Sequence, residues 1–389
     1  MAGDGWLDKA QVNAHYYNAV AGEISFATEA GGGSHSIAVA RLIGARAGGS
    51  KIRVLELGAN NCAFARLLIE ELWAASGSGE NELAGIEYVA VEYSRPSLEE
   101  ALRRELDEQL FERAGRGAGR VVATMGESGD FEIELTLVHS DANEFMRSSQ
   151  EPFDFVILNE LLDDLPYRAY FTDAGGTSFE AVPRSRGEDG RWTIRVDAEP
   201  GGPDGLPPAA VTAHSPESVE LVTAAAAVLS PGGMLLIHDY GFAEPFMPVE
   251  TYAAPPPSLP AFAELAFPDG DGFPRGFFRV FGNESKRVVQ VTNDVNFAEL
   301  ADALEPTGTV IAIPHGNAML NQGGTPQKGD GTFLGEFGEL AAGDDLDGQL
   351  ARLAAGQARI RNDFAAAYVA GRGTVFLDLI YVRGEQTGT

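Results

Sequence analysis

The sequence predicts an α/β fold built on a doubly wound, mostly parallel sheet. The first observation is the stretch from Lys51 to Arg66: an apolar run ends in Glu56, a tight turn follows at Gly58, and a helix-like apolar pattern begins. The second is that five apolar runs along the chain each end in polar or acidic residues. The carboxyl ends of parallel strands meet at one edge of a sheet, where such folds bind ligands. We therefore expect a ligand cleft at that edge.

The five apolar runs are the expected central strands of the sheet. They span residues 51–56, 87–92, 135–138, 153–158 and 234–237. A single acid at a strand end is usually a solvated residue or a helix cap. Five polar strand ends in succession are hard to explain in that way, and they favour a binding function.

The turn after the first strand is poor in glycine. A dinucleotide-binding turn reads G-x-G-x-x-G and receives a pyrophosphate, whereas the matching positions here are Gly58, Asn60 and Ala63. A phosphate cradle is therefore disfavoured. An acid at Glu56 suits an ammonium group, such as that of the methionine moiety of S-adenosylmethionine (SAM). The alternative is an ordinary strand–helix turn, and this motif alone does not separate the two.

Composition narrows the class of protein and its partners. The 389 residues carry 57 acids and 28 bases, a formal net charge of −29, and a single cysteine, Cys62. Such a field repels nucleic acid and anionic membranes and attracts cationic ligands, although general solubility is the larger cause of the charge. One cysteine allows no internal disulfide. No apolar run is long enough to span a membrane, and we expect a cytoplasmic protein. A homodimer is possible.

The pattern divides the chain into four parts. Residues 1–50 are expected to form a helical N-terminal cap, and residues 51–244 the ligand-binding core with a β-hairpin excursion at 168–208. Residues 245–296 form a Pro-rich insertion that cannot be regular helix or central strand at its AAPPPSLP segment. Residues 297–389 are expected to complete the sheet, with a helix at 346–368 after a polar, Gly-rich loop at 317–330.

Several motifs together resemble a known family. ELGANN, VAVEYS, HSDA and the PGG before the fifth strand look like the motif series of class I SAM-dependent methyltransferases. NELLDDLP, LLIHDYG, QVTNDVNFAEL and GTVFLDLIYV resemble the MidA-like methyltransferases, a group that includes the mitochondrial arginine methyltransferase of complex I assembly. The resemblance runs from about Ile52 to Val382. It departs at Asp294, where that family usually has histidine.

The resemblance implies a seven-stranded, mostly parallel sheet and a set of cofactor contacts. Glu56 and Gly58 would hold the methionine end of SAM, Glu92 the ribose hydroxyls, and Asp141 the adenine amino group beside the Ala142 amide. The cofactor residues expected in all are Glu56, Gly58, Asn60, Glu92, Tyr93, Asp141, Ala142 and Asn159. The cofactor is then SAM, and the product is S-adenosylhomocysteine.

The substrate side is expected at residues 159–166. Glu160, Asp163 and Asp164 share one face if the chain turns helical there, and clustered carboxylates repel one another unless a cation sits among them. A guanidinium pairs bidentately with carboxylates and is the cation we favour. The alternative is a helix N-terminus enriched in acids.

Five further side chains are candidates, with weaker support. His238 and Tyr240 follow the fifth strand and could bond the substrate or move a proton. Tyr16 and Tyr17 could close over a ligand, and His315 could contact it, although such residues more often serve packing or structural hydrogen bonds. The six histidines show no paired ligand spacing, so no metal site is expected.

These observations predict a SAM-dependent N-methyltransferase that acts on an arginine guanidinium. The Pro-rich insertion and the hairpin would wall the cleft, and a walled cleft favours free arginine or a related small metabolite over a protein arginine. The departures from the resembled family suggest a biosynthetic role for the enzyme. The enzymatic alternative is an O- or C-methyltransferase of a secondary metabolite. The alternative from another class is a catalytically silent assembly factor that uses the fold to bind a partner.

Overall fold

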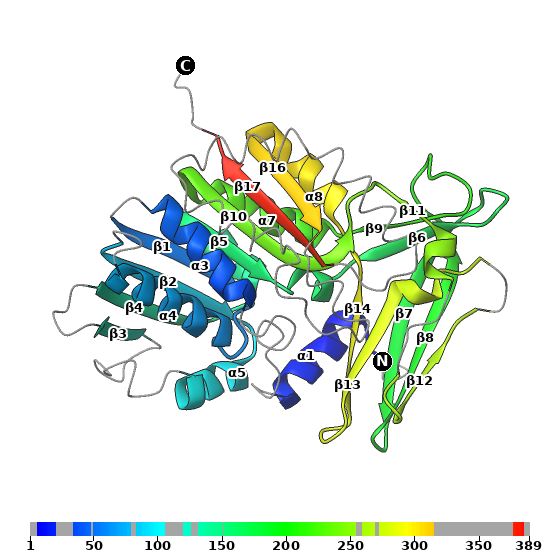
Figure 1. Ribbon diagram of the computed structural model, residues 1–389. Coiled ribbons are helices and arrows are strands. Elements are labelled where there is room, and N and C mark those ends of the chain that lie inside the picture. The colour runs from blue at the N-terminus through cyan, green and yellow to red at the C-terminus, as the bar shows by residue number, and fades with distance from the viewer. Residues whose placement is uncertain are drawn as a thin grey trace.

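The computed structural model describes residues 6–20, 34–47, 50–78, 83–105, 120–125, 131–149, 151–253, 259–268, 272–314 and 376–384. Two β-sheets lie side by side, with helix α1 (Lys9–Val20) near the junction between them (Figure 1). None of the helices in these ranges has the length and apolar character needed to span a bilayer. The predicted helix at 346–368, the loop at 317–330 and His315 lie outside the described residues.

The larger sheet is mostly parallel and has the order β16-β17-β10-β5-β1-β2-β4-β3, with β15 paired to β10. Its strands are β1 (Lys51–Leu57), β2 (Gly85–Glu92), β3 (Arg120–Met125), β4 (Phe131–His139), β5 (Phe153–Asn159), β10 (Leu229–Phe242), β15 (Val295–Asn296), β16 (Gly308–Pro314) and β17 (Phe376–Arg383). The five predicted central strands are confirmed as β1, β2, β4, β5 and β10. The edge strand β3 and the short β15 were not predicted, so the sheet exceeds the expected seven strands.

Helices cover both faces of this sheet, as a doubly wound fold requires. On one face, α3 (Ser34–Arg46), α4 (Ala63–Ser78) and α5 (Arg95–Glu100) bury residues such as Leu42, Leu68 and Leu98 against the strands. On the other face lie α6 (Ala142–Ser148), α7 (Pro216–Ala227) and α8 (Phe297–Leu304). Because both faces are buried, the central strands read as continuous apolar runs.

Strand β10 is the longest in the larger sheet and connects it to the chain beyond. It pairs in parallel with β5 and in antiparallel with β17. At its far end Gly241 pairs with Val295 of β15. A Cβ atom at Gly241 would lie 2.1 Å from the Val295 carbonyl oxygen, so the close approach of these two backbones requires glycine.

The smaller sheet contains the predicted hairpin excursion and has the order β11-β9-β6-β7-β8-β12. Its strands are β6 (Arg168–Thr172), β7 (Ser178–Glu188), β8 (Arg191–Pro200), β9 (Ala210–His214), β11 (Met247–Pro248) and β12 (Ala263–Ala266). A separate hairpin, β13 (Phe278–Asn283) with β14 (Val288–Asn293), packs against α1. The insertion after Tyr240 therefore contributes strands to the smaller sheet and to the surroundings of α1.

Short helical turns complete the connections. They are the π-helical turn η1 (Ala101–Glu105) and the 3₁₀ turns η2 (Leu162–Asp164), η3 (Val249–Tyr252), η4 (Arg275–Phe277) and η5 (Glu305–Thr307). Turn η2 follows β5 directly and carries two of the acids that the sequence singled out. The chain after β5 is therefore a single tight turn rather than the first turn of a regular helix.

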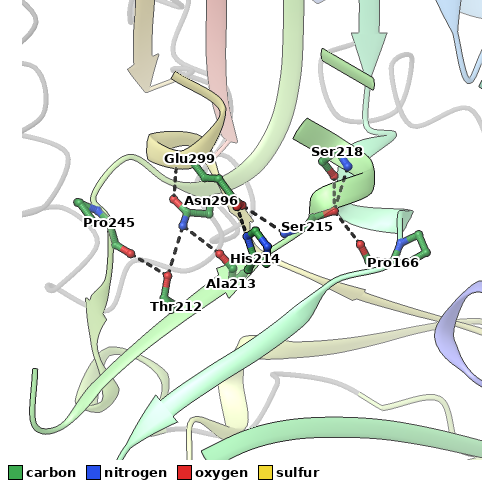
Figure 2. A network of polar contacts seen from close by, with 9 residues as sticks. All are labelled: Pro166, Thr212, Ala213, His214, Ser215, Ser218, Pro245, Asn296 and Glu299. Atoms are coloured by element: carbon green, nitrogen blue, oxygen red, sulfur yellow. Dashed lines mark hydrogen bonds and ion pairs between the residues drawn. The ribbon is translucent and has the colours of Figure 1, made fainter. Parts of the chain in front are cut away.

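A polar network holds the end of that turn in place (Figure 2). The Ser215 hydroxyl caps α7 by accepting a hydrogen bond from the Ser218 amide at 3.1 Å, and it donates to the Pro166 carbonyl at 2.7 Å. The Glu299 carboxylate of α8 accepts the Ser215 amide at 3.2 Å, and Asn296 caps α8 in turn. These bonds tie Pro166, at the end of the β5–β6 connection, to two helices of the larger sheet.

Candidate active site

A cavity of about 310 Å³ lies at the carboxyl ends of β1, β2, β4 and β5. One wall comes from α1, through Ala10, Asn13, Ala14 and Tyr17. All eight residues predicted to bind a cofactor line it: Glu56, Gly58, Asn60, Glu92, Tyr93, Asp141, Ala142 and Asn159. Glu160 and Asp164 line it as well. The strand ends thus form one cleft, as the sequence predicted.

The glycine-poor turn after β1 is held by backbone bonds to β2. The amides of Gly58 and Ala59 both donate to the Val91 carbonyl, at 2.9 and 3.0 Å. Gly58 has φ +78°, and a Cβ there would lie 3.0 Å from the Leu161 side chain. Asn60 adopts φ +46°, a region that asparagine tolerates better than most residues. Asn60 therefore makes part of the turn that glycine makes in dinucleotide-binding folds.

Glu92 fastens this turn to the end of β2. Its carboxylate accepts the Asn60 amide at 2.8 Å and the Ser94 amide at 2.6 Å. Burial raises its pKa, while these backbone hydrogen bonds act in the opposite direction. Each carboxylate oxygen has a second lone pair, so Glu92 can still accept hydrogen bonds from a ligand in the cavity.

Glu56 is the most deeply buried acid of the cavity wall, with 2% of its surface exposed. The Tyr88 hydroxyl donates to it at 2.8 Å. Burial raises its pKa to about 7, and the nearby Glu92 carboxyl adds to the shift. The group therefore titrates near neutrality, and a cation placed beside it would favour its charged form.

Asp141 and its neighbours form the third part of the wall. The Asp141 carboxylate caps α6 by accepting the Glu144 amide at 3.0 Å, and Ala142 begins the helix. His139, at the end of β4, lies 3.0 Å from the Tyr93 carbonyl oxygen through Nε2. Tyr93 itself is half exposed at the rim. The capping bond uses Oδ1 of Asp141, a residue that also lines the cavity.

Four carboxyl groups crowd the connection after β5: Glu160, Asp163, Asp164 and Asp239. Glu160 has φ +49°, and its amide donates to the His238 carbonyl at 2.7 Å. Such a backbone conformation in a glutamate is uncommon and is typical of functional sites. Burial, together with repulsion from Asp163 and Asp164, raises the Glu160 pKa well above its ordinary value.

The two aspartates of η2 bond to different elements. Asp164 accepts hydrogen bonds from Asn13 at 2.7 Å, from Tyr17, and from Gln290 of β14 at 2.9 and 3.1 Å. Burial and the charge of Asp163 together raise the Asp164 pKa to about 7, against the opposing effects of Lys9 and the hydrogen bonds from Tyr17 and Gln290. Asp163 accepts the Thr292 hydroxyl at 2.7 Å. It does not line the cavity.

Asp239 of β10 stabilises turn η2 through hydrogen bonds to its backbone. It is fully buried and accepts three amides: Leu162 at 2.9 Å, Asp163 at 3.1 Å and Tyr240 at 2.9 Å. Burial raises its pKa well above the ordinary range, and the Asp163 charge acts in the same direction. Asp239 therefore fixes the conformation of η2 rather than contacting the cavity.

The cation among these acids is Lys9 of α1. Its ammonium donates to the carbonyls of Asp163 and Leu165 and to Asn293 Oδ1, the last two at 3.0 and 2.6 Å. It also lies 4.3 Å above the Tyr167 ring. Burial lowers the Lys9 pKa to about 8, although the charges of Asp164, Asp163 and Asp239 oppose the shift. The protein itself thus supplies a cation to the carboxylate cluster.

Two acceptor atoms of the cavity lining have no hydrogen-bond donor among the described residues. Asn159 Oδ1 and Glu160 Oε1 are buried and accept no hydrogen bond from the described part of the chain. A buried polar atom without a partner costs about 1–3 kcal/mol, so sites of this kind usually receive a ligand. The two atoms come from adjacent residues at the end of β5. As acceptors, they favour a ligand that carries hydrogen-bond donors.

The remaining predicted residues lie away from the cavity lining. Tyr240 is buried, its hydroxyl lies 2.8 Å from the Thr292 hydroxyl, and Arg279 lies 4.9 Å above its ring. Tyr16 is buried against Tyr17 in an edge-on contact. The His238 side chain lies on the side of β10 opposite to Asp239, where it contacts Asp378. Their predicted roles at the substrate stay predictions, as does that of His315.

Sequence reasoning missed Lys9, Asn13, Gln290 and Asp239. The first two lie on a helix far from the motifs, and no local signal indicates that they meet η2. Asp239 lies in the DYG motif, which indicated its importance without its structural role. Asp294, the departure from the resembled family, pairs with Arg279 and accepts the Tyr252 hydroxyl at 2.6 Å. The aspartate at that position is therefore part of a buried ion pair.

The fold and the strand-end cleft define a class I methyltransferase. A family model described as "Putative S-adenosyl-L-methionine-dependent methyltransferase" matches residues 35–255, more than half of the chain. The chain belongs to this family of SAM-dependent methyltransferases, and SAM is its cofactor. Two observations fit this cofactor. A ligand can approach the backbone closely at Gly58, and acids stand at successive strand ends.

Two solved structures are similar to this chain, and the first of them agrees with the fold. An uncharacterized protein from Burkholderia thailandensis is 18% identical, with a TM-score of 0.51 over 98% of this chain and 88% of the other. A second structure from that organism, bound to S-adenosylhomocysteine, is 18% identical with a TM-score of 0.47 over 97% and 78%. No curated protein matches the chain significantly.

The burial of Glu56 predicts how cofactor affinity changes with pH. If Glu56 binds the ammonium group, binding favours its charged form, so affinity rises as pH rises through the Glu56 pKa of about 7. Between pH 5.5 and 7, below the range in which a free α-amino group titrates, the affinity for S-adenosylhomocysteine should rise about tenfold. Calorimetry at several pH values measures this change.

The Glu56→Gln variant is the control, because glutamine keeps the size of the side chain and does not titrate. Its affinity should be low and nearly constant over this pH range. An equal pH dependence in the wild type and the variant would show that another group causes it.

Proposed function

We propose that the protein is a SAM-dependent N-methyltransferase that acts on the guanidinium of free arginine or of a related small metabolite, with protein arginine as the second choice. The observation that carries the proposal is the pair of unpartnered acceptors, Asn159 Oδ1 and Glu160 Oε1, in the cavity wall. A guanidinium carries five N–H donors in a planar fork and no acceptor, and so it matches two adjacent acceptors.

The cofactor is expected along the strand ends next to this pair. Glu56 and Gly58 would receive its methionine end, Glu92 its ribose hydroxyls, and Asp141 with Ala142 its adenine. Asn60 and Tyr93 would complete the wall around it. The cofactor supplies the methyl group on its sulfonium, and the residues of this chain bind, orient and exchange protons.

Glu160 is the residue expected to manage the proton. A protonated guanidinium is a poor nucleophile, so one N–H must lose its proton as the new N–CH₃ bond forms and the S–CH₃ bond breaks. A carboxylate with a raised pKa is a stronger proton acceptor than an exposed one, and burial raises the pKa of Glu160. The proton passes from the guanidinium nitrogen to Glu160 Oε1 and then to solvent.

The carboxylates of η2 have a different part in this proposal. Both oxygens of Asp164 accept hydrogen bonds from α1 or β14, and Lys9 lies beside the turn. Asp163 and Asp164 would therefore act on the substrate through their charge, while Glu160 and Asn159 make the direct bonds. This division differs from the expectation from sequence, which gave direct contact with all three acids and placed Asn159 at the cofactor.

The wall formed by α1 favours a small substrate. Helix α1 lines the cavity that the cofactor and the substrate would share. A protein segment would need access past α1, whose Tyr17 and Asn13 are bonded to Asp164. These contacts support a free amino acid or small metabolite over a peptide.

A competition assay tests the substrate class and its size together. Methyl-labelled SAM is incubated with the protein and equal amounts of free arginine, free lysine and an arginine-containing peptide, and each is analysed by mass spectrometry. We expect label in free arginine, less in the peptide and none in lysine, because an ammonium is a point charge without the planar fork. Label in lysine alone, or in none of the three, would reject the guanidinium substrate.

The Glu160→Gln variant tests the residue that carries the proposal. Glutamine keeps the size and removes both the charge and the proton acceptor, so turnover should fall by about 10²–10⁴-fold while affinity for S-adenosylhomocysteine changes little. The Glu144→Gln variant, at an exposed position of α6 outside the cavity lining, is the matched control and should retain normal turnover. A collapse of cofactor binding with normal turnover per bound cofactor would assign Glu160 to the cofactor instead.

A further inference from the structure

Three buried side chains far apart in the sequence meet on the other side of β10 from Asp239. They are His35 near the start of α3, His238 of β10 and Asp378 of β17, and they are exposed by only 5%, 7% and 2%. One potential ligand atom from each lies within 4.8 Å of the other two. The proposed methyl transfer uses none of these three side chains in the cavity.

The backbone explains why they meet. His238 and Asp378 are directly opposite each other in the antiparallel pairing of β10 with β17, so their side chains point to the same face. His238 Nδ1 lies 2.8 Å from Asp378 Oδ1. Helix α3 covers that face, and its His35 ring lies over the His238 ring with centroids 4.1 Å apart.

The surroundings suit an ion and exclude a larger ligand. The three side chains border a cavity of about 10 Å³ whose other walls are aliphatic: Val39, Ile157, Leu236, Ile237, Leu379 and Ile380. That volume is close to the minimum for one water-sized guest. A carboxylate and two imidazoles in an apolar enclosure are a donor set that binds a divalent first-row metal ion.

We propose that His35, His238 and Asp378 form a structural metal site that takes one Zn²⁺. Ligand atoms around a tetrahedral zinc ion lie about 3.4 Å apart, so small side-chain rotations from the present arrangement bring the three into range. Two histidines and a carboxylate supply three of the four ligands that zinc usually takes. The ion joins α3, β10 and β17, which come from positions more than 300 residues apart.

The site is joined to the proposed substrate residue by one backbone hydrogen bond. The His238 carbonyl accepts the amide of Glu160 at 2.7 Å, while its side chain belongs to the metal site. Fixing His238 therefore fixes the strand end that holds Glu160 in its unusual backbone conformation. The proposal does not depend on the substrate, and its test needs no turnover.

Metal content and affinity of the untagged full-length protein test the site. Elemental analysis after purification, and Zn²⁺ titration of chelator-treated protein against a competing indicator, should show one ion per chain and a higher melting temperature with zinc. His35→Gln and Asp378→Asn should weaken zinc binding by at least about 100-fold. The exposed His15→Gln variant is the control and should bind zinc like the wild type.

Substitution with Co²⁺ provides a readout that needs no variant. The wild type should give the intense visible absorption of tetrahedral cobalt, and zinc should abolish it. Absence of stoichiometric Zn²⁺ or Co²⁺ binding in the wild type would overturn the proposal and leave a hydrogen-bonded Asp–His–His cluster. Equal zinc affinity in the wild type and both folded variants would overturn it as well, because the ion would then bind elsewhere.

Discussion

The ammonium of Lys9 is the interaction on which the cleft depends. Three carboxyl groups follow β5, at Glu160, Asp163 and Asp164, and a fourth belongs to Asp239 of β10. Desolvation is the largest cause that raises the pKa of each. Lys9 enters this region from α1 and bonds the backbone of η2 and the side chain of Asn293. Helix α1, the turn after β5 and the β14 strand are thereby held around a single charge.

The same arrangement separates structural acids from the ones available for chemistry. Asp239 accepts three backbone amides, and Asp164 is bonded by side chains of α1 and β14, so both have their acceptors filled by the protein. Glu160 keeps an acceptor in the cavity. Because Glu56 and Asp164 have pKa values near 7 when folded and near 4 when unfolded, the folded protein binds more protons between these values. Their contribution to stability is therefore complete below the unfolded pKa values and is lost progressively as pH rises from there through the folded pKa of about 7.

The sequence predicted the parts of the structure that depend on local pattern. Apolar runs, a tight turn and polar strand ends identified the central strands and placed the cofactor residues from Glu56 to Asn159 in one cleft, because parallel strands must end at one edge. It could not predict that Lys9 meets η2 or that His35 meets His238, since those contacts depend on how helices pack across long sequence separations. Strand β3 was missed at an edge, where few contacts constrain the pattern.

The Lys9→Met variant tests the role of this charge most directly, with hydrogen exchange of α1 as the measurement. Methionine keeps an apolar side chain of similar length and removes the ammonium. The acceptors on Asp163, Leu165 and Asn293 then lose this donor, and each buried acceptor left unsatisfied costs about 1–3 kcal/mol. The account predicts faster exchange in residues 12–20 and weaker binding of S-adenosylhomocysteine, with the exposed Lys51→Met variant unchanged in both. Equal α1 protection and equal affinity in Lys9→Met and the wild type would contradict it.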